Sequence, residues 1–360
     1  MSKFLSKRFE TLSPYVPGEQ PKINNLIKLN TNESPFKPSK KASNFAKKEL
    51  DKLNLYSDPE CSFLVKKLSE VLGVKDENVI VTNGSDEILN FAFMAYCDSK
   101  TSVAFPDITY GFYKVFAKLN GIDFLEIPLK EDFSIDIKDY FNLSKTIFIA
   151  NPNAPTGLYL TLEKIEEILK NNKDNIVVID EAYIDFGNES AIKLIDYYDN
   201  LLVTGTFSKS RSMAGARLGF GVASKKIIED LNMIRYSTNP YNINRMTMTA
   251  GYGVLCDEKY TKKNIEIICE NREYLKNQLT DLGFSFPDST ANFIFVKHNV
   301  ISGETLYNEL RKRNILVRHF KDERIKDYLR ITIGTKKEMQ ILVCNIKKIL
   351  EEQNENKWNY

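Results

Sequence analysis

The chain has 360 residues, of which 42% are hydrophobic and 27% charged, an ordinary composition for a soluble globular protein with one large core and a second, smaller domain. Its 50 basic and 48 acidic side chains leave a net charge of +2 without a basic block, which argues against nucleic-acid and anionic-membrane partners. Its apolar stretches are far shorter than the roughly 20 residues of a membrane span, and no signal peptide is evident, so we expect a cytoplasmic protein.

Short runs that are apolar at every position recur in the first two thirds of the chain. They occupy residues 79–81, 103–105, 147–150, 176–179 and 201–203. Such runs predict strands that are buried on both faces of a parallel sheet. Residues 162–169 carry apolar side chains at helical spacing between two of these runs, so the pattern favours an α/β domain.

A different pattern begins near residue 256. The sequence predicts a helix over 262–282, a strand over 292–296, a helix over 304–312, strands over 315–317 and 328–333, and a last helix over 339–350. Gly283 is a typical helix stop, and Thr335 with Glu338 has the spacing of a capping box. These elements indicate a smaller α+β module.

Lys209 is the residue with the most distinctive surroundings. It follows the strand predicted at 201–203, Thr206 and Ser208 lie just before it, and Arg217 lies downstream. A desolvated lysine at the rim of a sheet can form a Schiff base with a carbonyl. The hydroxyls and Arg217 suit a dianionic phosphate. A solvated Ser/Lys loop is the alternative, and the adjoining pattern argues against it.

Asp180 ends the run at 176–179, and Tyr183 lies three residues further on. Against a pyridine nitrogen, the Asp180 carboxylate would keep that nitrogen protonated and make the ring an electron sink. Tyr183 could bond a phenolic oxygen on the same ring. The alternative for Asp180 is a helix N-cap, a common role of Asp after a strand.

Two further segments follow predicted strands. Gly84, Ser85 and Asp86 come after the run at 79–81, and a helix N-terminus there would offer free N–H groups to a phosphate. Tyr110 follows the run at 103–105 and could stack on a flat ring, or be an ordinary core or surface tyrosine. All these residues lie at the carboxyl ends of strands, where open parallel sheets bind ligands.

Metal chemistry has little support in the sequence. The only histidines are His298 and His319, and the five cysteines are scattered without metal-ligand or disulfide spacing. We therefore expect no metal, and expect the chemistry to come from Lys209 and its neighbours.

Together these segments resemble the fold-type I pyridoxal-phosphate (PLP) aminotransferases, and among them the histidinol-phosphate aminotransferase family. The resemblance covers nearly the whole chain and includes LNTNESPF (29–36), NGSDEIL (83–89), NPNAPTG (151–157), VVIDEAY (177–183), FSKSRSMAGARLGFG (207–221) and LRITIGT (329–335). It implies pyridoxal 5′-phosphate as cofactor and an aspartate aminotransferase-like α/β fold. The expected large domain, residues 35–255, has a mainly parallel seven-stranded sheet, and residues 1–34 and 256–360 form the smaller α+β domain.

The resemblance also assigns roles to individual residues. Lys209 becomes the Schiff-base lysine, Asp180 the partner of the pyridine nitrogen and Tyr183 the ligand of the ring hydroxyl. The other implied cofactor contacts are Tyr110, stacked on the ring, and Ser85, Asp86, Thr206, Ser208 and Arg217 at the phosphate. Tyr56 is expected to reach the phosphate of a neighbouring subunit, which implies a homodimer with shared active sites. The implied substrate ligands are Arg330, Arg318, Tyr15 and Asn32.

One position departs from the family pattern. The family usually has two asparagines before PTG, and the second is replaced here by Ala154. Either Asn153 takes over the contact with the ring oxygen, or Tyr183 makes it alone. The loss of one neutral hydrogen bond, about 1 kcal/mol, would tune the Schiff base without abolishing the chemistry.

The implied reaction transfers an amino group from histidinol phosphate to 2-oxoglutarate, giving imidazole-acetol phosphate and glutamate. Alternatives within the fold are a transaminase or decarboxylase of another small phosphorylated amine, and an aromatic amino acid aminotransferase. An alternative from another functional class is a PLP-binding module without catalytic activity. A nicotinamide-dependent oxidoreductase is disfavoured because GxGxxG does not follow the first strand, and residues 215–221 imitate it poorly.

Overall fold

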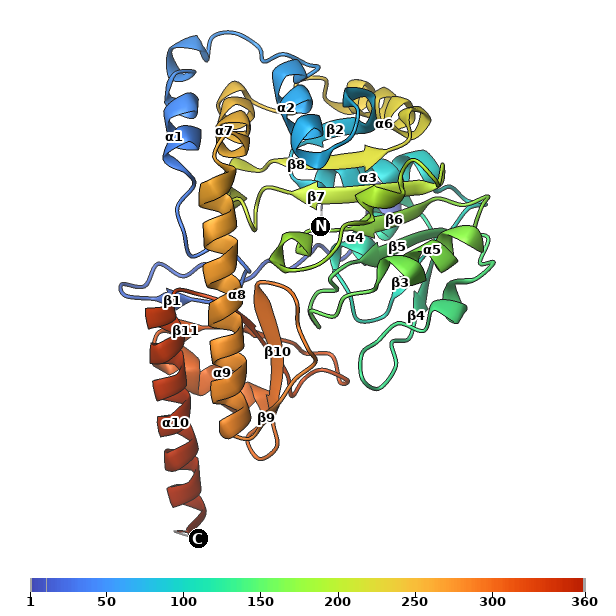
Figure 1. Cartoon of the computed structure of the whole chain (residues 1–360). Helices are drawn as coiled ribbons and strands as arrows, with labels where there is room; N and C mark the ends of the chain where they lie inside the picture. Colours follow the sequence, from blue (N-terminus) through green and yellow to red (C-terminus); the bar gives the residue numbers. More distant parts are fainter. Residues whose placement is uncertain (1, 11, 359–360) are drawn as a thin grey trace.

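The computed structural model describes residues 2–10 and 12–358. Figure 1 shows a large part, built on one sheet, and a smaller part, with the long helix α8 (Glu258–Asp281) running from the first into the second. The predicted α/β class with a mainly parallel seven-stranded sheet is confirmed.

The large sheet has the strand order β2-β8-β7-β6-β5-β3-β4. Its strands are β2 (Val79–Thr82), β3 (Val103–Pro106), β4 (Phe124–Ile127), β5 (Thr146–Ala150), β6 (Val177–Asp180), β7 (Leu201–Thr206) and β8 (Gly219–Ala223). β8 runs antiparallel to both of its neighbours, β2 and β7, and the other strand pairs of the sheet are parallel. All five predicted strands are present. The sequence missed β4, a half-exposed edge strand, and β8, whose alternating glycines hide its strand character.

Side chains alternate between the two faces of this sheet and bury a layer of helices on each. On β6, Val177 and Ile179 pack into one hydrophobic cluster and Val178 packs into the other. The first cluster includes residues of α1 (Lys40–Lys47), α2 (Ser62–Leu72), α5 (Leu162–Lys170) and α7 (Arg245–Leu255). The second includes residues of α3 (Ser85–Tyr96), α4 (Phe112–Asn120) and α6 (Lys225–Thr238). The strands are therefore apolar at every position because both faces are covered.

The smaller part has its own core around α8, α9 (Gly303–Lys312) and α10 (Lys336–Trp358). Its four-stranded antiparallel sheet has the order β12-β13-β10-β9, with β9 Phe284–Ser285, β10 Phe293–His298, β12 Arg318–His319 and β13 Leu329–Thr332. A second sheet pairs β1 (Ile27–Lys28) with β11 (Ile315–Leu316). The strand predicted at 315–317 is present as β11, and the sequence missed β12: the chain changes partner at the buried Val317, from β1 to β13.

The pairing of β1 with β11 joins the N-terminal segment to the C-terminal elements. The predicted boundary at residues 255 and 256 falls between α7 and α8. The division into two domains stays a prediction.

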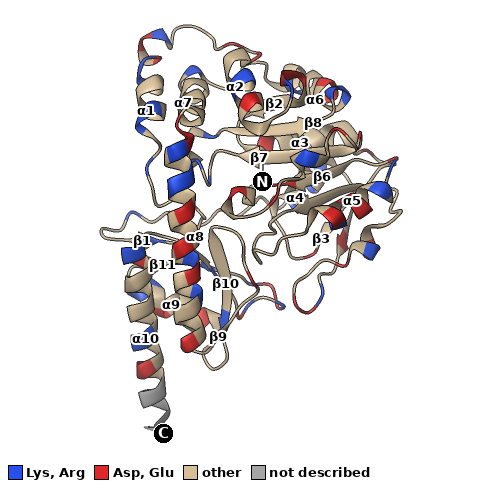
Figure 2. Ribbon diagram, viewed as in Figure 1, with Lys and Arg blue, Asp and Glu red and all other residues tan. Residues whose placement is uncertain are grey.

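In the part of the chain that the structure describes, seven 3₁₀ helices lie before or between the larger elements. They are η1 (Lys7–Phe9), η2 (Leu50–Lys52), η3 (Asp76–Asn78), η4 (Ile137–Tyr140), η5 (Ile184–Phe186), η6 (Ala191–Leu194) and η7 (Ala214–Ala216). Lysines, arginines and acidic residues are mixed over the outer helices, and the central strands carry few of them (Figure 2). Within residues 2–10 and 12–358, no helix combines the length and the apolar character that a membrane crossing requires.

Candidate active site

Strand register brings three of the predicted phosphate-binding segments together. Thr82 at the end of β2 and Thr206 at the end of β7 both pair with Gly219, the first residue of β8. Because β8 is antiparallel to both strands, it begins at the edge of the sheet where β2 and β7 end. Arg217, two residues before β8, therefore lies at that edge. The N-terminus of α3 begins at Ser85, three residues after β2.

Two glycines make this close approach possible. A Cβ at Gly219 would lie 2.4 Å from the backbone nitrogen of Ser85. Gly84 has a φ of +79°, and a Cβ there would lie 2.5 Å from Arg217 Nη2. Any side chain at either position would therefore fill the cradle. The first N–H groups of α3, which have no partner within the helix, face this space together with the helix dipole.

A cavity of about 440 Å³ opens at this edge of the sheet. It is lined by most of the residues predicted to contact the cofactor: Ser85, Asp86, Tyr110, Asp180, Tyr183, Thr206, Ser208, Lys209 and Arg217. Gln20, Thr31 and Glu33 also line it and were not predicted, because no local pattern marks them as ligands.

A second cavity, of about 370 Å³, shares Lys209, Tyr110 and Tyr183 with the first. The four predicted substrate ligands, Tyr15, Asn32, Arg318 and Arg330, line this second cavity. The Lys209 Nζ donates to the carbonyl oxygen of Thr31 at 3.3 Å and lies 5.7 Å from the centre of the Tyr183 ring. The lysine amine therefore sits where the two cavities meet.

Asp180 is the buried acid of the first cavity, with only 4% of its surface exposed. Tyr113 Oη donates to its Oδ2 at 3.0 Å, and Thr204 Oγ1 donates to its Oδ1 at 3.1 Å. Burial raises the pKa of Asp180 to about 6, and the hydrogen bond from Tyr113 opposes this rise. The carboxylate is therefore largely ionised at neutral pH and suited to a cationic partner.

Asp86 connects two other groups of the first cavity. Its Oδ2 lies 2.8 Å from Arg217 Nη2, and its Oδ1 accepts a hydrogen bond from Tyr110 Oη at 2.7 Å. The guanidinium is thereby held beside the N-terminus of α3, and the Tyr110 ring is held over the cavity.

The second cavity contains two adjacent guanidinium groups. Arg318 and Arg330 face each other across β12 and β13 as register partners. Arg330 is partly buried, and the resulting desolvation lowers its pKa; its Nη2 donates to the Asn30 carbonyl oxygen at 3.1 Å. Within the described part of the chain, Arg330 Nε has no hydrogen-bond partner. A partly buried cation with a free N–H at a cavity wall favours an anionic ligand.

Asn32, predicted as a substrate ligand, also contacts Tyr183, one of the predicted catalytic residues. Its Nδ2 donates to Tyr183 Oη at 3.0 Å, and its Oδ1 accepts from Thr332 Oγ1 at 3.0 Å. Asn32 has a φ of 56°, a conformation that asparagine tolerates better than most residues. Since Tyr183 Oη accepts this bond, its own proton remains free to donate into the cavity.

Asn153 is placed differently from the prediction. Its Nδ2 donates to the Ile108 carbonyl oxygen and to Thr156 Oγ1, and its Oδ1 accepts from Thr109 Oγ1. Asn153 lines neither cavity, whereas Ala154 lines both. The Asn153 amide therefore already forms hydrogen bonds within the protein. Tyr183 is the remaining candidate for a hydrogen bond to the cofactor's ring oxygen.

Tyr56 also lies outside both cavities of its own chain. Its side chain is 79% exposed, and its ring stacks on Tyr241 at a centroid distance of 4.4 Å. This position leaves a role in a neighbouring subunit open.

Comparison with known proteins identifies the family. The family model described as aminotransferase class I and II matches residues 24–346. The chain belongs to this family. It is 51% identical to the histidinol-phosphate aminotransferase of Brachyspira hyodysenteriae, over 98% of this chain and 100% of that protein. It is 48% identical to the enzyme of the same name from Clostridium acetobutylicum, over 97% of this chain and 100% of that protein.

A solved structure shows the same fold. The histidinol-phosphate aminotransferase from Sinorhizobium meliloti, in complex with pyridoxal 5′-phosphate, superimposes with a TM-score of 0.90 at 20% identity. The match covers 98% of this aminotransferase chain and 99% of that chain. PLP has a phosphate, a pyridine nitrogen and an aldehyde. The first cavity of this chain provides a glycine-lined cradle, a buried carboxylate and a lysine amine, so its residues fit the cofactor.

Proposed function

We propose that this aminotransferase is a PLP-dependent enzyme that transfers the amino group of histidinol phosphate to 2-oxoglutarate. The observation that carries the proposal is the position of Lys209, between a phosphate cradle with a buried acid and a cavity with two paired arginines. The identity to histidinol-phosphate aminotransferases over almost the full chain supports the same function.

Bound PLP supplies an aldehyde that condenses with amines and a protonated ring that withdraws electrons. In our proposal, Lys209 would hold the cofactor, and its amine would move the proton at the substrate α-carbon. Asp180 would keep the ring nitrogen protonated, and Tyr183 would donate to the ring oxygen. The phosphate would be held by Arg217, by the hydroxyls of Thr206 and Ser208, and by the N–H groups of Ser85 and Asp86. Tyr110 would cover one face of the ring.

Arg318 and Arg330 are proposed to bind the acidic group of each substrate. Two adjacent guanidinium groups suit a phosphate dianion better than a single cation would, because each can donate two N–H groups to its oxygens. The same pair can accept a carboxylate of 2-oxoglutarate. Tyr15 and Asn32 complete the cavity wall.

A panel of amines tests the substrate. Purified enzyme loaded with PLP would be mixed with histidinol phosphate, histidinol, O-phosphothreonine or phenylalanine, and the products identified by mass spectrometry. We expect the keto product of histidinol phosphate, with much slower conversion of histidinol. Equal rates with both donors would refute the arginine assignment. Carbon dioxide release from O-phosphothreonine, or faster conversion of phenylalanine, would support the alternative functions.

Borohydride reduction tests the lysine. Reduction of the PLP-loaded protein should leave a covalent adduct on the peptide that contains Lys209, and the Lys209→Ala variant should lack it. An adduct on another lysine would refute the assignment.

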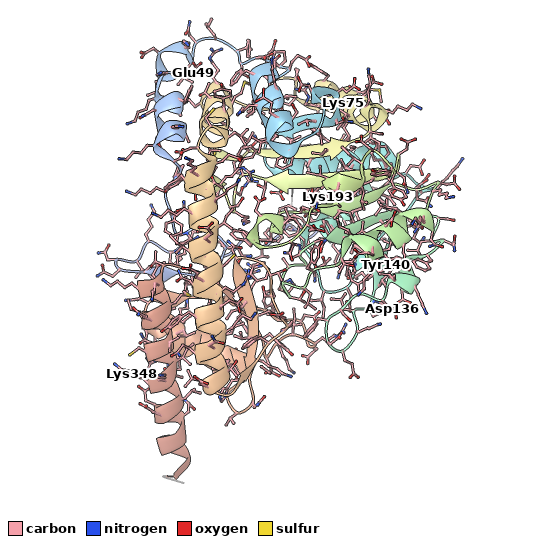
Figure 3. All side chains as sticks on the ribbon, viewed as in Figure 1. Glu49, Lys75, Asp136, Tyr140, Lys193 and Lys348 are labelled. Atoms are coloured by element: carbon pink, nitrogen blue, oxygen red, sulfur yellow. The ribbon has the colours of Figure 1, made fainter. Side chains whose placement is uncertain are left out.

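A homodimer with shared active sites is the proposed assembly. The exposed ring of Tyr56 is accompanied by the exposed apolar side chains of Leu50, Leu53, Leu55 and Phe63. Arg245 fixes this segment, because it pairs with Glu49 at 2.8 Å and donates to the Tyr56 carbonyl oxygen at 2.9 Å. Figure 3 shows Glu49 at the end of the molecule opposite Lys348. A second copy covering this surface would bring Tyr56 to its partner's phosphate cradle.

Mixing variants tests the shared sites. Tyr56→Ala and Lys209→Ala homodimers should each have low activity, but a hybrid of the two has one native site. Refolding the variants together should therefore restore part of the activity. Tyr197→Ala, which removes a tyrosine that is 78% exposed, is the matched control and should be fully active by itself. Failure of the mixture to regain activity, although hybrids form, would refute sharing. The cytoplasmic location stays a prediction.

A further inference from the structure

Tyr113 is a fully buried residue at the start of α4, and the sequence did not mark it as functional. Its hydroxyl donates to Asp180 Oδ2 at 3.0 Å, while Thr204 Oγ1 donates to Oδ1 at 3.1 Å. Each oxygen of the carboxylate is therefore held by a donor from a different element, α4 or β7. Together the two donors fix the plane of the carboxylate.

Tyr113 also contacts the residue proposed to cover the cofactor ring. The ring centroids of Tyr110 and Tyr113 lie 5.7 Å apart at an interplanar angle of 88°, a favourable edge-to-face arrangement. A single phenol thus contacts both the acid of the first cavity and the stacking ring.

Burial raises the pKa of two neighbouring carboxyl groups of this segment. Burial raises the pKa of Glu181 to about 8, whereas it raises that of Asp180 only to about 6. The Tyr113 hydrogen bond is the largest contribution that opposes the effect of burial at Asp180. Tyr113 therefore helps to keep a deeply buried acid ionised.

An ordinary core tyrosine is the alternative, and Tyr140 provides the comparison within the same chain. Tyr140 is 1% exposed, and its hydroxyl has no hydrogen-bond partner within the described residues. It lies in η4, lines neither cavity and is labelled in Figure 3. The hydroxyl of Tyr113 differs because it is directed at a carboxylate in the cavity wall.

We propose that Tyr113 is a positioning residue for transamination, which holds the Asp180 carboxylate in the orientation that meets the cofactor's ring nitrogen. The inference rests on the proposed function, in which Asp180 contacts that nitrogen. Tyr113 acts through Asp180 and has no contact of its own with the reacting atoms.

Tyr113→Phe tests the inference, because it removes the hydroxyl and leaves the ring edge against Tyr110. A hydrogen bond to a charged group is worth enough to change a rate or an affinity by roughly tenfold or more. We expect kcat to fall about tenfold, with KM for the amine within about twofold, and the dissociation constant of PLP to rise about tenfold. The circular dichroism of bound PLP should also change, because it reports the orientation of the ring.

Two further variants make the test specific. Tyr140→Phe removes a buried hydroxyl elsewhere and should leave kcat, PLP affinity and circular dichroism unchanged. Thr204→Val removes the other donor to Asp180 and should repeat the pattern of Tyr113→Phe, which keeps the test available if the tyrosine variant folds poorly.

Wild-type circular dichroism, PLP affinity and kcat in Tyr113→Phe would overturn the inference. A loss of thermal stability with unchanged kcat would also overturn it, because that result describes a purely structural tyrosine. A different result would refute the proposed function: a wild-type protein that binds PLP but converts no amine. In that case the circular dichroism and PLP affinity of the variants still decide the role of Tyr113.

Discussion

Arg217 Nη2 lies 2.8 Å from Asp86 Oδ2, so the guanidinium at the start of β8 is already fixed beside the N-terminus of α3. A cation in this place can bind a phosphate without first being ordered, because its side-chain freedom is already lost. The helix N-terminus, the glycine cradle and the guanidinium then act on the same anion.

We predict that Arg217→Lys weakens PLP binding by about tenfold or more, because an ammonium cannot donate two parallel N–H groups to phosphate. Equilibrium dialysis of the cofactor-free protein measures the change. The matched control is Arg313→Lys, which alters a guanidinium paired with Glu309 and Glu352 in the smaller part. Unchanged affinity in Arg217→Lys would contradict the assignment of Arg217 to the phosphate.

Gly219→Ala should disrupt the cradle itself. The added Cβ would lie 2.4 Å from the backbone of Gly84 and of Ser85, neither of which can rotate away. We expect a loss of stability of roughly 1–3 kcal/mol, as in overpacked cores, together with weaker PLP binding. Thermal unfolding of the cofactor-free protein measures the first effect. Gly215→Ala is the control, because its Cβ would meet no atom within 4 Å and the cofactor-free protein should unfold as wild type.

Asn32→Asp should reverse the hydrogen bond to Tyr183. The variant keeps the shape of the side chain and its tolerance of a φ of 56°, but the atom facing Tyr183 becomes an acceptor. Tyr183 would then donate its proton to residue 32 and no longer to the cofactor's ring oxygen. We expect kcat to fall about tenfold and the pH midpoint of the cofactor absorbance to shift. Asn345→Asp, on α10, is the control, and equal behaviour of the two variants would refute the prediction.

Glu181 should make stability depend on pH. Burial raises the pKa of Glu181 to about 8, so between its ordinary value and that pH the folded protein retains a proton that the unfolded chain has lost. Its contribution to stability is therefore fully present at low pH and is lost as the pH rises through about 8. Asp180, with a pKa raised to about 6 by burial, acts in the same direction over a lower range.

We predict that Glu181→Gln becomes more stable relative to wild type as the pH rises from about 5 to 8, by on the order of 1–3 kcal/mol. A glutamine can still accept from the Ala191 N–H, which donates to Glu181 at 2.6 Å, and can donate to Ser190 Oγ. Urea unfolding of the cofactor-free protein at several pH values measures the difference. Glu304→Gln, on the exposed first turn of α9, is the surface control measured in the same way. A pH-independent difference between Glu181→Gln and wild type would contradict the prediction.

The sequence by itself determined the class of fold and the segments that form the first cavity. The five apolar runs became β2, β3, β5, β6 and β7, because a strand covered on both faces must be apolar at every position. Once those strands are parallel, their carboxyl ends share one edge. The residues that follow them, Lys209 and Asp180 among them, then converge without any further information.

Only the tertiary structure decided which side chains touch. Asn32 and Tyr183 are 151 positions apart, and Tyr113 and Asp180 are 67 apart, yet both pairs are hydrogen-bonded. Arg318 faces Arg330 because β12 and β13 are in register, and Asn153 turns away because Ile108 and Thr109 offer it better partners. Local patterns report burial and periodicity, which depend on near neighbours. Contacts such as these depend on how separate elements pack, and no local pattern contains that information.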